Sequence, residues 1–528
     1  MNHRTELSAA RRLGQAAGLL ALLLLASGCA TYQQDTQAFT QATRGGAGGL
    51  MAAIPQIEQK AAKSAGSKDE LIYRLEHGTT LRTAALADPS LVPSIVPPAP
   101  PVKAGEVAPP PPPLPTAEEV SAEYARRSNA AFDLAEEKVN AWEEQAKTKV
   151  GAELGAALTN QASLPYRGRA YDKVMMNTYK ALNYLSLRDK DKARVELNRS
   201  LQRQRDAVTE NEKRIAKASE EAAAAARGEL KDEQGKSAAY DANRAVDDPK
   251  TGPALQAALD ASIAPMKPYG DYVNPFAVFL DGLFFTTLGE VGDDWERGRK
   301  SFERVASMVP DNAFLQADLA AAAAAAEGKS PEGVTYVIFE TGTAPSRDQV
   351  RVDIPTFLVT SRLAYVGASF PKLVFNQDYV PALSVTAGDQ TVNTAIVASM
   401  DSVIANDFKN EWPTVVTKTL ITTATKAIVQ AAVQKAAEDR GGMWAGLAAS
   451  VIMSGINAAT NIADTRTWTS LPKEFQYARV ATPASRELTI SAGTEQKTVK
   501  LVDGSVNVVY VKSSSSSSPL FVSQFALK

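Results

Sequence analysis

Few residues of this chain belong to the types that carry nucleophilic or metal chemistry. The 528 residues include one cysteine, Cys29, and two histidines, His3 and His77. These are too few for a zinc site built from several Cys or His ligands, and a single cysteine forms no internal disulfide. A Ser-His-Asp hydrolase would have to use His77, which lies in a segment of helical periodicity far from any nucleophile motif. With no Walker loop and no dinucleotide fingerprint either, we predict a protein that is not an enzyme and binds no metal and no cofactor.

Carboxylates are the remaining candidates for acid–base chemistry. Glu340, Asp348, Asp353 and Asp401 lie in or near the part of the sequence that is rich in β-branched residues. Two carboxylates held about 5–9 Å apart across a cleft would suit glycoside cleavage. Nothing in the spacing of these four brings a pair together, and scattered acids are usually solvated. A carboxylate-based hydrolase of cell-wall glycan stays open as an alternative function.

An arginine and a tryptophan lie close together in the run from Asp464 to Trp468, after an apolar segment. Because Arg and Trp are typical anchors of binding interfaces, Arg466 and Trp468 are candidate contacts to a partner. The interpretation that we favour is structural. In that case the Asp464 carboxylate accepts hydrogen bonds from backbone amides at a turn, and Trp468 packs in the core.

Cys29 itself ends a pattern typical of protein export. Arginines precede an apolar run from Ala16 to Ala26, which is too short for the roughly 20 residues of a stable membrane-spanning helix. The following Leu25-Ala26-Ser27-Gly28-Cys29 resembles the bacterial lipobox. That resemblance implies cleavage of residues 1–28 as a signal peptide and attachment of acyl chains to Cys29, which would anchor the protein in a membrane. The alternative is an ordinary signal peptide with an incidental cysteine.

The membrane that the anchor would enter is indicated by the next residue. Ala30 follows the cysteine, rather than the aspartate that retains lipoproteins in the inner membrane of enteric bacteria. We therefore expect a lipid anchor in the outer membrane, with the protein on the periplasmic face. The formal net charge is −2. Binding to nucleic acid needs a concentrated positive field, so we expect no nucleic-acid partner.

Two segments carry small and aromatic residues at the spacing of tetratricopeptide repeats. They are Tyr171–Gln204, with Ala181, Tyr184, Ala193, Leu197 and Ser200, and Phe276–Pro310, with Gly282, Phe285, Gly298, Phe302 and Pro310. Small residues let two helices approach closely, and the aromatic rings fill the gap beside them. We predict a stacked helical hairpin at each segment; a generic antiparallel helix pair is the alternative.

A third, degenerate hairpin is predicted from Ser128, Phe132 and Ala135, with its first helix at Lys68–Ala87. The Pro-rich stretch at 93–115 would then be a loop inserted in the turn of that hairpin. Its other interpretation is a polyproline spacer or a docking ligand for a partner.

The concave face of the helical array is where we expect a protein partner, with contacts at Tyr179, Asn183 and Arg194. A dense charge run extends from Arg188 to Arg199. We interpret this run as a solvated helix face with intrahelical ion pairs.

Residues 331–528 differ from the helical part by their β-branched and aromatic runs. We expect strands near 334–339, 350–359, 373–375, 383–386, 392–398, 475–480, 486–490, 498–502, 506–511 and 520–526. Between them, 401–437 has the pattern of a long helix interrupted at Pro413. Met443–Ala463 carries no charge. We favour a helix buried against the sheet there, and a membrane-contacting hairpin is the alternative.

The chain is too long for one compact core, so the sequence predicts several units. Residues 29–67 would form a lipidated tether and residues 68–330 a tetratricopeptide-like helical domain. Residues 331–528 would form a mixed, mostly antiparallel β domain with inserted helices. The predicted fold class is therefore α+β.

Several segments also resemble an uncharacterised family of bacterial lipoproteins with tetratricopeptide-like helices. They are KALNYLSLRDKDKARVELNR, YVIFETGTAP, AYVGASFPKL and ADTRTWTSLPKEFQYARV, and the similarity covers roughly residues 68–510. The family has no established activity, so the resemblance implies architecture and location rather than chemistry. Genes of this family tend to lie near small outer-membrane lipoproteins linked to activation of peptidoglycan synthases. The Pro-rich insertion and the Ser513–Ser518 tract are departures from the family pattern.

Together these features predict an outer-membrane lipoprotein that acts as a periplasmic scaffold for unidentified envelope proteins. Cell-envelope or peptidoglycan assembly is the process that we expect it to serve. Besides the glycan hydrolase, a structural component of a secretion or motility complex is an alternative.

Overall fold

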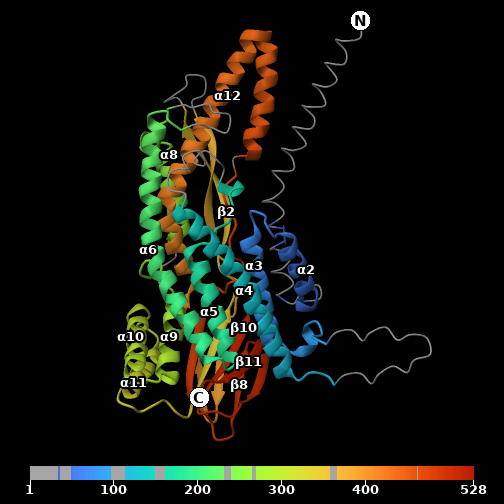
Figure 1. The fold of residues 1–528 in the computed structure, drawn as a ribbon, viewed down its shortest axis with the longest axis vertical. Helices are drawn as coiled ribbons and strands as arrows, with labels where there is room; N and C mark the ends of the chain where they lie inside the picture. Colours follow the sequence, from blue (N-terminus) through green and yellow to red (C-terminus); the bar gives the residue numbers. More distant parts are fainter. Residues whose placement is uncertain are drawn as a thin grey trace, which may run out of the picture.

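The computed structural model describes residues 32, 34, 35, 44, 49–96, 113–148, 161–230, 239–264, 269–356, 365–460 and 462–528. The predicted signal peptide, Cys29 and most of the Pro-rich insertion lie outside these residues. Within them, helices occupy the first part of the chain and mixed sheets occupy the last part (Figure 1). The predicted α+β fold class is confirmed.

Antiparallel helical hairpins build the first part. They are α3 (Glu70–Leu86) with α4 (Ala117–Thr148), α5 (Ala170–Ser186) with α6 (Lys190–Ala226), and α9 (Pro275–Leu288) with α10 (Gly292–Met308). The hairpin of α3 and α4 is the one predicted as degenerate, and the Pro-rich stretch lies between its helices. Its two helices are joined by Ser128, whose hydroxyl donates a 2.7 Å hydrogen bond to the carbonyl of Gly78.

Glycines set the close approach of α9 and α10. A Cβ on Gly298 would lie 2.7 Å from the backbone nitrogen of Thr286, and one on Gly282 would lie 3.1 Å from the Phe302 ring. Neither position has room for a side chain without movement of its neighbour. The small-residue spacing in the sequence therefore corresponds to a real contact between two helices.

Shorter helices complete the helical part. They are α2 (Gly49–Lys63), α7 (Ala242–Val246), α8 (Thr251–Ile263) and α11 (Ala313–Ala326), with 3-10 turns η1 (Pro89–Leu91) and η3 (Gln161–Ser163). Of these, α2 corrects the predicted tether at 29–67, because it packs on α3 through buried apolar residues such as Leu50 and Ile54.

The main sheet has the strand order β11-β10-β1-β7-β6. Its strands are β1 (Val334–Thr341), β6 (Ala395–Ser399), β7 (Glu474–Ala481), β10 (Val506–Ser513) and β11 (Phe521–Ala526). Only β1 and β10 pair in parallel among these neighbours. Both are buried along their whole length, which explains why they read as continuous apolar runs in the sequence.

Two antiparallel pieces flank this sheet. A ribbon pairs β2 (Ser346–Pro355) with β3 (Tyr365–Val374). A second sheet has the order β5-β4-β8-β9, from β4 (Ser384–Ala387), β5 (Gln390–Asn393), β8 (Glu487–Ala492) and β9 (Glu495–Lys500). The expected mixed, mostly antiparallel arrangement is observed.

One long element, α12 (Met400–Thr460), is inserted between β6 and β7. Pro413 lies inside it, so the interruption predicted at that residue is wrong; the break in helical geometry falls at Gly442, where φ is 75°. This conformation is easy only for glycine. The chain reverses there, and Figure 1 shows the reversal at one end of the longest axis of the molecule. Among the described residues, no helix is long and apolar enough to cross a membrane.

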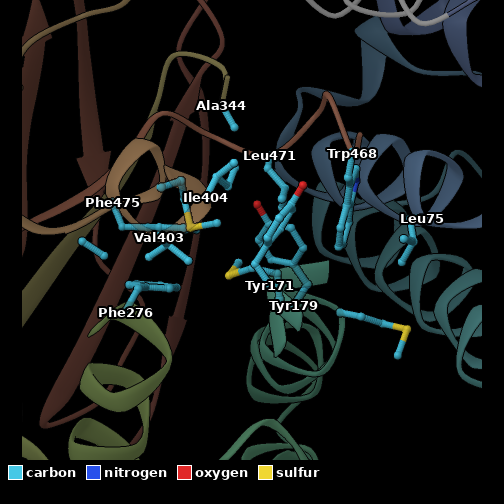
Figure 2. Close-up of a cluster of buried hydrophobic side chains, with 14 of the residues drawn as sticks. Leu75, Tyr171, Tyr179, Phe276, Ala344, Val403, Ile404, Trp468, Leu471 and Phe475 are labelled. Carbon is cyan, nitrogen blue, oxygen red and sulfur yellow. The ribbon is translucent and has the colours of Figure 1, made fainter. Parts of the chain in front are cut away.

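Helices and sheets share one hydrophobic core. The rings of Phe276 on α9 and Phe475 on β7 stack with centroids 3.8 Å apart. Trp468 packs against Tyr179 of α5, and Figure 2 shows these side chains in one cluster with Leu75 of α3 and Val403 of α12. The predicted boundary at residue 330 therefore separates types of secondary structure and does not separate two cores.

Candidate functional site

Two helices from different hairpins, α6 and α10, run side by side in the same direction and form what we call the α6–α10 seam. The seam is defined by contacts between pairs of residues, one from each segment, whose residue numbers differ by a nearly constant amount. Lys190 pairs with Glu290 at 2.5 Å, just before α10 begins. One turn further on, Arg194 pairs with Asp294. Because both contacts join residues 100 positions apart, the two helices stay in register along the seam.

The middle of the seam is held by a buried carboxylate. Asp281 of α9 is fully buried and accepts hydrogen bonds from Arg297 at 2.5 Å and from Ser301 at 2.7 Å. Burial raises the pKa of Asp281, although Arg297 and Ser301 act in the opposite direction. Arg297 in turn donates a 2.6 Å hydrogen bond to Asn198 of α6. One arginine therefore ties α6, α9 and α10 together and fixes the wall of the site.

The pairing of charged residues across the seam ends two helical turns further on. Arg205 of α6 and Arg304 of α10 both line the same hollow, and they continue the ladder at an offset of 99 residues, as Asn198 and Arg297 do. Burial and the positive charge of Arg205 lower the pKa of Arg304. Within the part of the chain that the structure describes, neither guanidinium has a carboxylate at ion-pair distance. Two like charges therefore line one site. The positive charge of Arg205 also acts to lower the pKa of Asp281, whose carboxylate is already paired with Arg297.

The hollow beside these arginines has a volume of about 620 Å³, which lies in the range of ligand-binding clefts. Leu201 and Val278 give it an apolar floor. Asp293, at the start of α10, lines its other end and is exposed. Eleven residues separate Asp293 from Arg304, which corresponds to about 16 Å along a helix. The site is thus elongated, with an acid at one end and two cations at the other.

Two of the predicted partner contacts lie in the core instead. Tyr179 and Asn183 of α5 are both fully buried. Asn183 accepts a 2.7 Å hydrogen bond from Arg82 and donates one to Ser128. The prediction that these two side chains lie on a partner-binding face is therefore wrong. The inner side of α5 is covered by α3 and α4, so its polar residues bond to those helices.

Arg466 and Trp468 are likewise inside the protein. The Arg466 guanidinium pairs with Asp464 at 2.8 Å and with Asp69 at 2.9 Å. The Trp468 indole donates a 3.0 Å hydrogen bond to Thr79. The backbone amide of Arg466 also donates to Asp464. The structural interpretation is therefore confirmed for this corner, and the candidate partner contacts there are wrong.

Arg194 is the predicted residue that the structure places beside the candidate site. Its side chain is about one-third exposed, and its guanidinium lies 5.0 Å from the centre of the Phe285 ring. Since its charge is already used by Asp294, Arg194 joins α6 to α10 rather than offering a free group to a ligand.

The acids proposed for glycan cleavage are each paired with a lysine. The pairs are Glu340 with Lys512, Asp348 with Lys372, Asp353 with Lys250, and Asp401 with Lys473. Asp348 and Asp353 are five residues apart on β2, so they point to opposite faces of the ribbon. This arrangement favours structural roles for the four acids. No group of His, Cys, Asp or Glu suited to a metal ion occurs among the described residues.

Sequence reasoning missed Arg205, Arg297 and Arg304, and treated the charge run at 188–199 as a solvated face. In the structure that run reaches two neighbouring helices: Arg194 bonds to α10, whereas Arg199 bonds to Glu136 of α4. A signal was present, because Lys190, Arg194 and Asn198 recur every four residues on one helix face. The partner helix, however, lies a hundred residues away in the sequence.

No protein-family model matches this chain, and neither a curated protein nor a solved structure is significantly similar to it. The functional argument therefore depends on the residues and their geometry.

Proposed function

We propose that this protein is an outer-membrane lipoprotein that acts as a scaffold for an envelope protein on the periplasmic face. The observation that carries the proposal is the hollow along the α6–α10 seam, which is lined by two exposed arginines, Arg205 and Arg304, that have no carboxylate at ion-pair distance among the described residues. Such a charged hollow is suited to binding a partner of complementary charge.

The helical hairpins support a scaffold role. Ion pairs join the second helices of the three hairpins: Arg199 of α6 pairs with Glu136 of α4, and Arg194 of α6 pairs with Asp294 of α10. Stacked hairpins of this kind present extended surfaces to protein partners. A tetratricopeptide-like array remains our interpretation of this arrangement, motivated by the positions of Gly282, Gly298 and Phe302.

The membrane part of the proposal comes from the lipobox-like sequence at Cys29. Three residues further on, the buried hydroxyl of Tyr32 donates a 2.6 Å hydrogen bond to the carbonyl of Thr467. The body of the protein therefore begins almost directly after the proposed anchor. Changing Cys29 to Ser should move the protein from the membrane fraction to the soluble periplasm, whereas Ala30→Ser should leave it in the membrane.

The scaffold is tested by photo-crosslinking in living cells, with a photoreactive amino acid at Gln202 in the full-length protein. Gln202 lines the hollow and is exposed. The control position is Leu134 on α4, which is 44 % exposed and lies outside the hollow. A small, reproducible set of envelope proteins captured from Gln202 and not from Leu134 is the expected result. Equal capture at both positions, or no capture at either, would contradict a partner in this hollow.

A further inference from the structure

The charges at the far end of the α6–α10 seam indicate which chemical groups a partner would need in order to bind there. Along its first turns the charged residues that reach across the seam meet a partner: Lys190 of α6 meets Glu290, Arg194 of α6 meets Asp294, and Arg297 of α10 meets Asn198 of α6. At the last step, Arg205 and Arg304 repel each other in the same hollow. Like charges that face each other are mildly destabilising, and an anion between them relieves the repulsion.

The other cations of the hollow have a carboxylate at ion-pair distance, although Glu296, the acid beside Lys300, is shared with Arg299. Arg297 pairs with Asp281, and Lys300 reaches Glu296 at 3.5 Å. This leaves a surplus of positive charge at the Arg205 and Arg304 end and the carboxylate of Asp293 at the opposite end. A ligand that matches both ends is anionic at one end and cationic at the other, with an apolar middle for Leu201 and Val278.

We propose that this hollow binds an acidic peptide segment of the partner, with its carboxylates between Arg205 and Arg304 and a basic group near Asp293. The inference rests on the proposed scaffold function and adds the chemical class of its ligand. Guanidinium groups suit carboxylates because their planar donors form paired, charge-assisted hydrogen bonds. A peptide fits the elongated shape, whereas an inorganic anion or a lipid phosphate would use only one end of the hollow.

Binding is tested on the purified, full-length, lipidated protein in detergent by fluorescence anisotropy. The probe is a labelled, amidated hexapeptide, Lys-Ala-Leu-Ala-Glu-Glu, and its comparison is the charge-swapped peptide Glu-Ala-Leu-Ala-Lys-Lys. The double variant R205Q/R304Q removes the proposed cations, and R126Q removes an exposed arginine of α4 that lies outside the hollow. Inorganic phosphate and vesicles of phosphatidylglycerol serve as competitors.

We expect the acidic peptide to bind the wild-type protein and R126Q alike, and to bind R205Q/R304Q at least tenfold more weakly. Affinity should fall as salt rises, because the contact is between exposed charges. Asp293→Lys should lower the preference for the peptide that carries lysine at its first position. Phosphate at millimolar concentration and anionic vesicles should compete poorly.

Other outcomes overturn the inference in distinct ways. Equal binding of both peptides, or no effect of R205Q/R304Q, would show that the arginines do not select an acidic segment. Strong competition by phosphate or by the vesicles would show that the site takes a phosphate group, free or on a lipid. The scaffold itself is judged separately: if R205Q/R304Q still crosslinks the same partner from Gln202 in cells, the scaffold stands and only the acidic-segment inference fails.

Discussion

Two seams meet on helix α6, and they differ in how their charges are matched. On the α4–α6 seam every arginine of α6 that crosses finds an acid: Arg199 lies 3.1 Å from Glu136 and Arg203 lies 2.7 Å from Glu143. On the α6–α10 seam the pairing of opposite charges ends at Arg205 and Arg304. Because α6 supplies one side of each seam, the difference in charge pairing comes from the individual side chains on the two faces of α6 and not from the helix as a whole. The matched seam holds the fold together, and the unmatched end is available for a ligand.

The matched seam depends most on Lys180, so its loss should have the largest effect. Lys180 is 1 % exposed and contacts Glu136 at 2.7 Å and Glu196 at 2.9 Å. Lys180→Met should destabilise the fold by about 3 kcal/mol, because it leaves two buried carboxylates short of a cation. Urea unfolding followed by circular dichroism measures the change. The matched control is Lys190→Met on the other seam, whose pair with Glu290 is more than half exposed and should be dispensable.

The wall behind the α6–α10 seam is fixed by the contact of α9 with α10. Gly298→Ala should destabilise the protein by about 2 kcal/mol, because the new methyl group would overlap the backbone of Thr286. Gly292→Ala, in the first turn of the same helix, meets no atom within 4 Å and should be neutral or slightly stabilising. Thermal unfolding of the two variants separates close packing from helix propensity. Equal effects would mean that the two helices are not in close contact.

Acid should weaken the α4–α6 seam. Burial raises the pKa of Glu143, but Lys173 and Arg203 outweigh it, so the pKa lies below its ordinary value. A carboxyl group whose pKa is lowered by folding contributes stability that is present above the unfolded pKa, near 4.5, and is lost as the pH falls through the folded value. Between pH 6 and pH 3, Glu143→Gln should therefore lose less stability than the wild type. A parallel loss in both proteins would contradict the role of Glu143.

The smallest expected effect has the opposite sign. Arg304→Gln should stabilise the fold by about 0.3 kcal/mol at low salt, because it removes a like-charge contact with Arg205. Arg203→Gln on the matched seam should instead destabilise it by about 1 kcal/mol. Denaturation midpoints at low and high salt test both. A destabilising Arg304→Gln would indicate a structural partner for this arginine and would remove the distinction between the two seams.

Local spacing was enough to predict the hairpins and most of the strands. Gly282, Gly298 and Phe302 lie within one hairpin, so their pattern in the sequence directly reflects a contact between its two helices. The alternating and continuous apolar runs after residue 333 likewise predicted the strands. In both cases the information lies within a few turns of the chain.

The functional site and the roles of the buried polar residues could not be predicted from local patterns, because they depend on contacts between residues far apart in the sequence. Trp468 hydrogen-bonds to Thr79, 389 residues away, so the sequence favoured a core role for Trp468 but left a binding role open. Arg205 and Arg304 come together only because α6 and α10 lie in register, which no local pattern reveals. Tyr179 has the residue type of an interface anchor, yet its burial depends on how α3 and α4 cover α5.

Tyr32 has a consequence for how such a protein would search for its partner. The three residues from Cys29 to Tyr32 span at most about 11 Å when fully extended, and the Tyr32 ring is fixed by Thr467 and by the edge of Tyr73. If Cys29 carries acyl chains, Tyr32 would lie close to the bilayer and the body would diffuse within the plane of the bilayer. Confinement to two dimensions raises the effective concentration of any partner on the same leaflet.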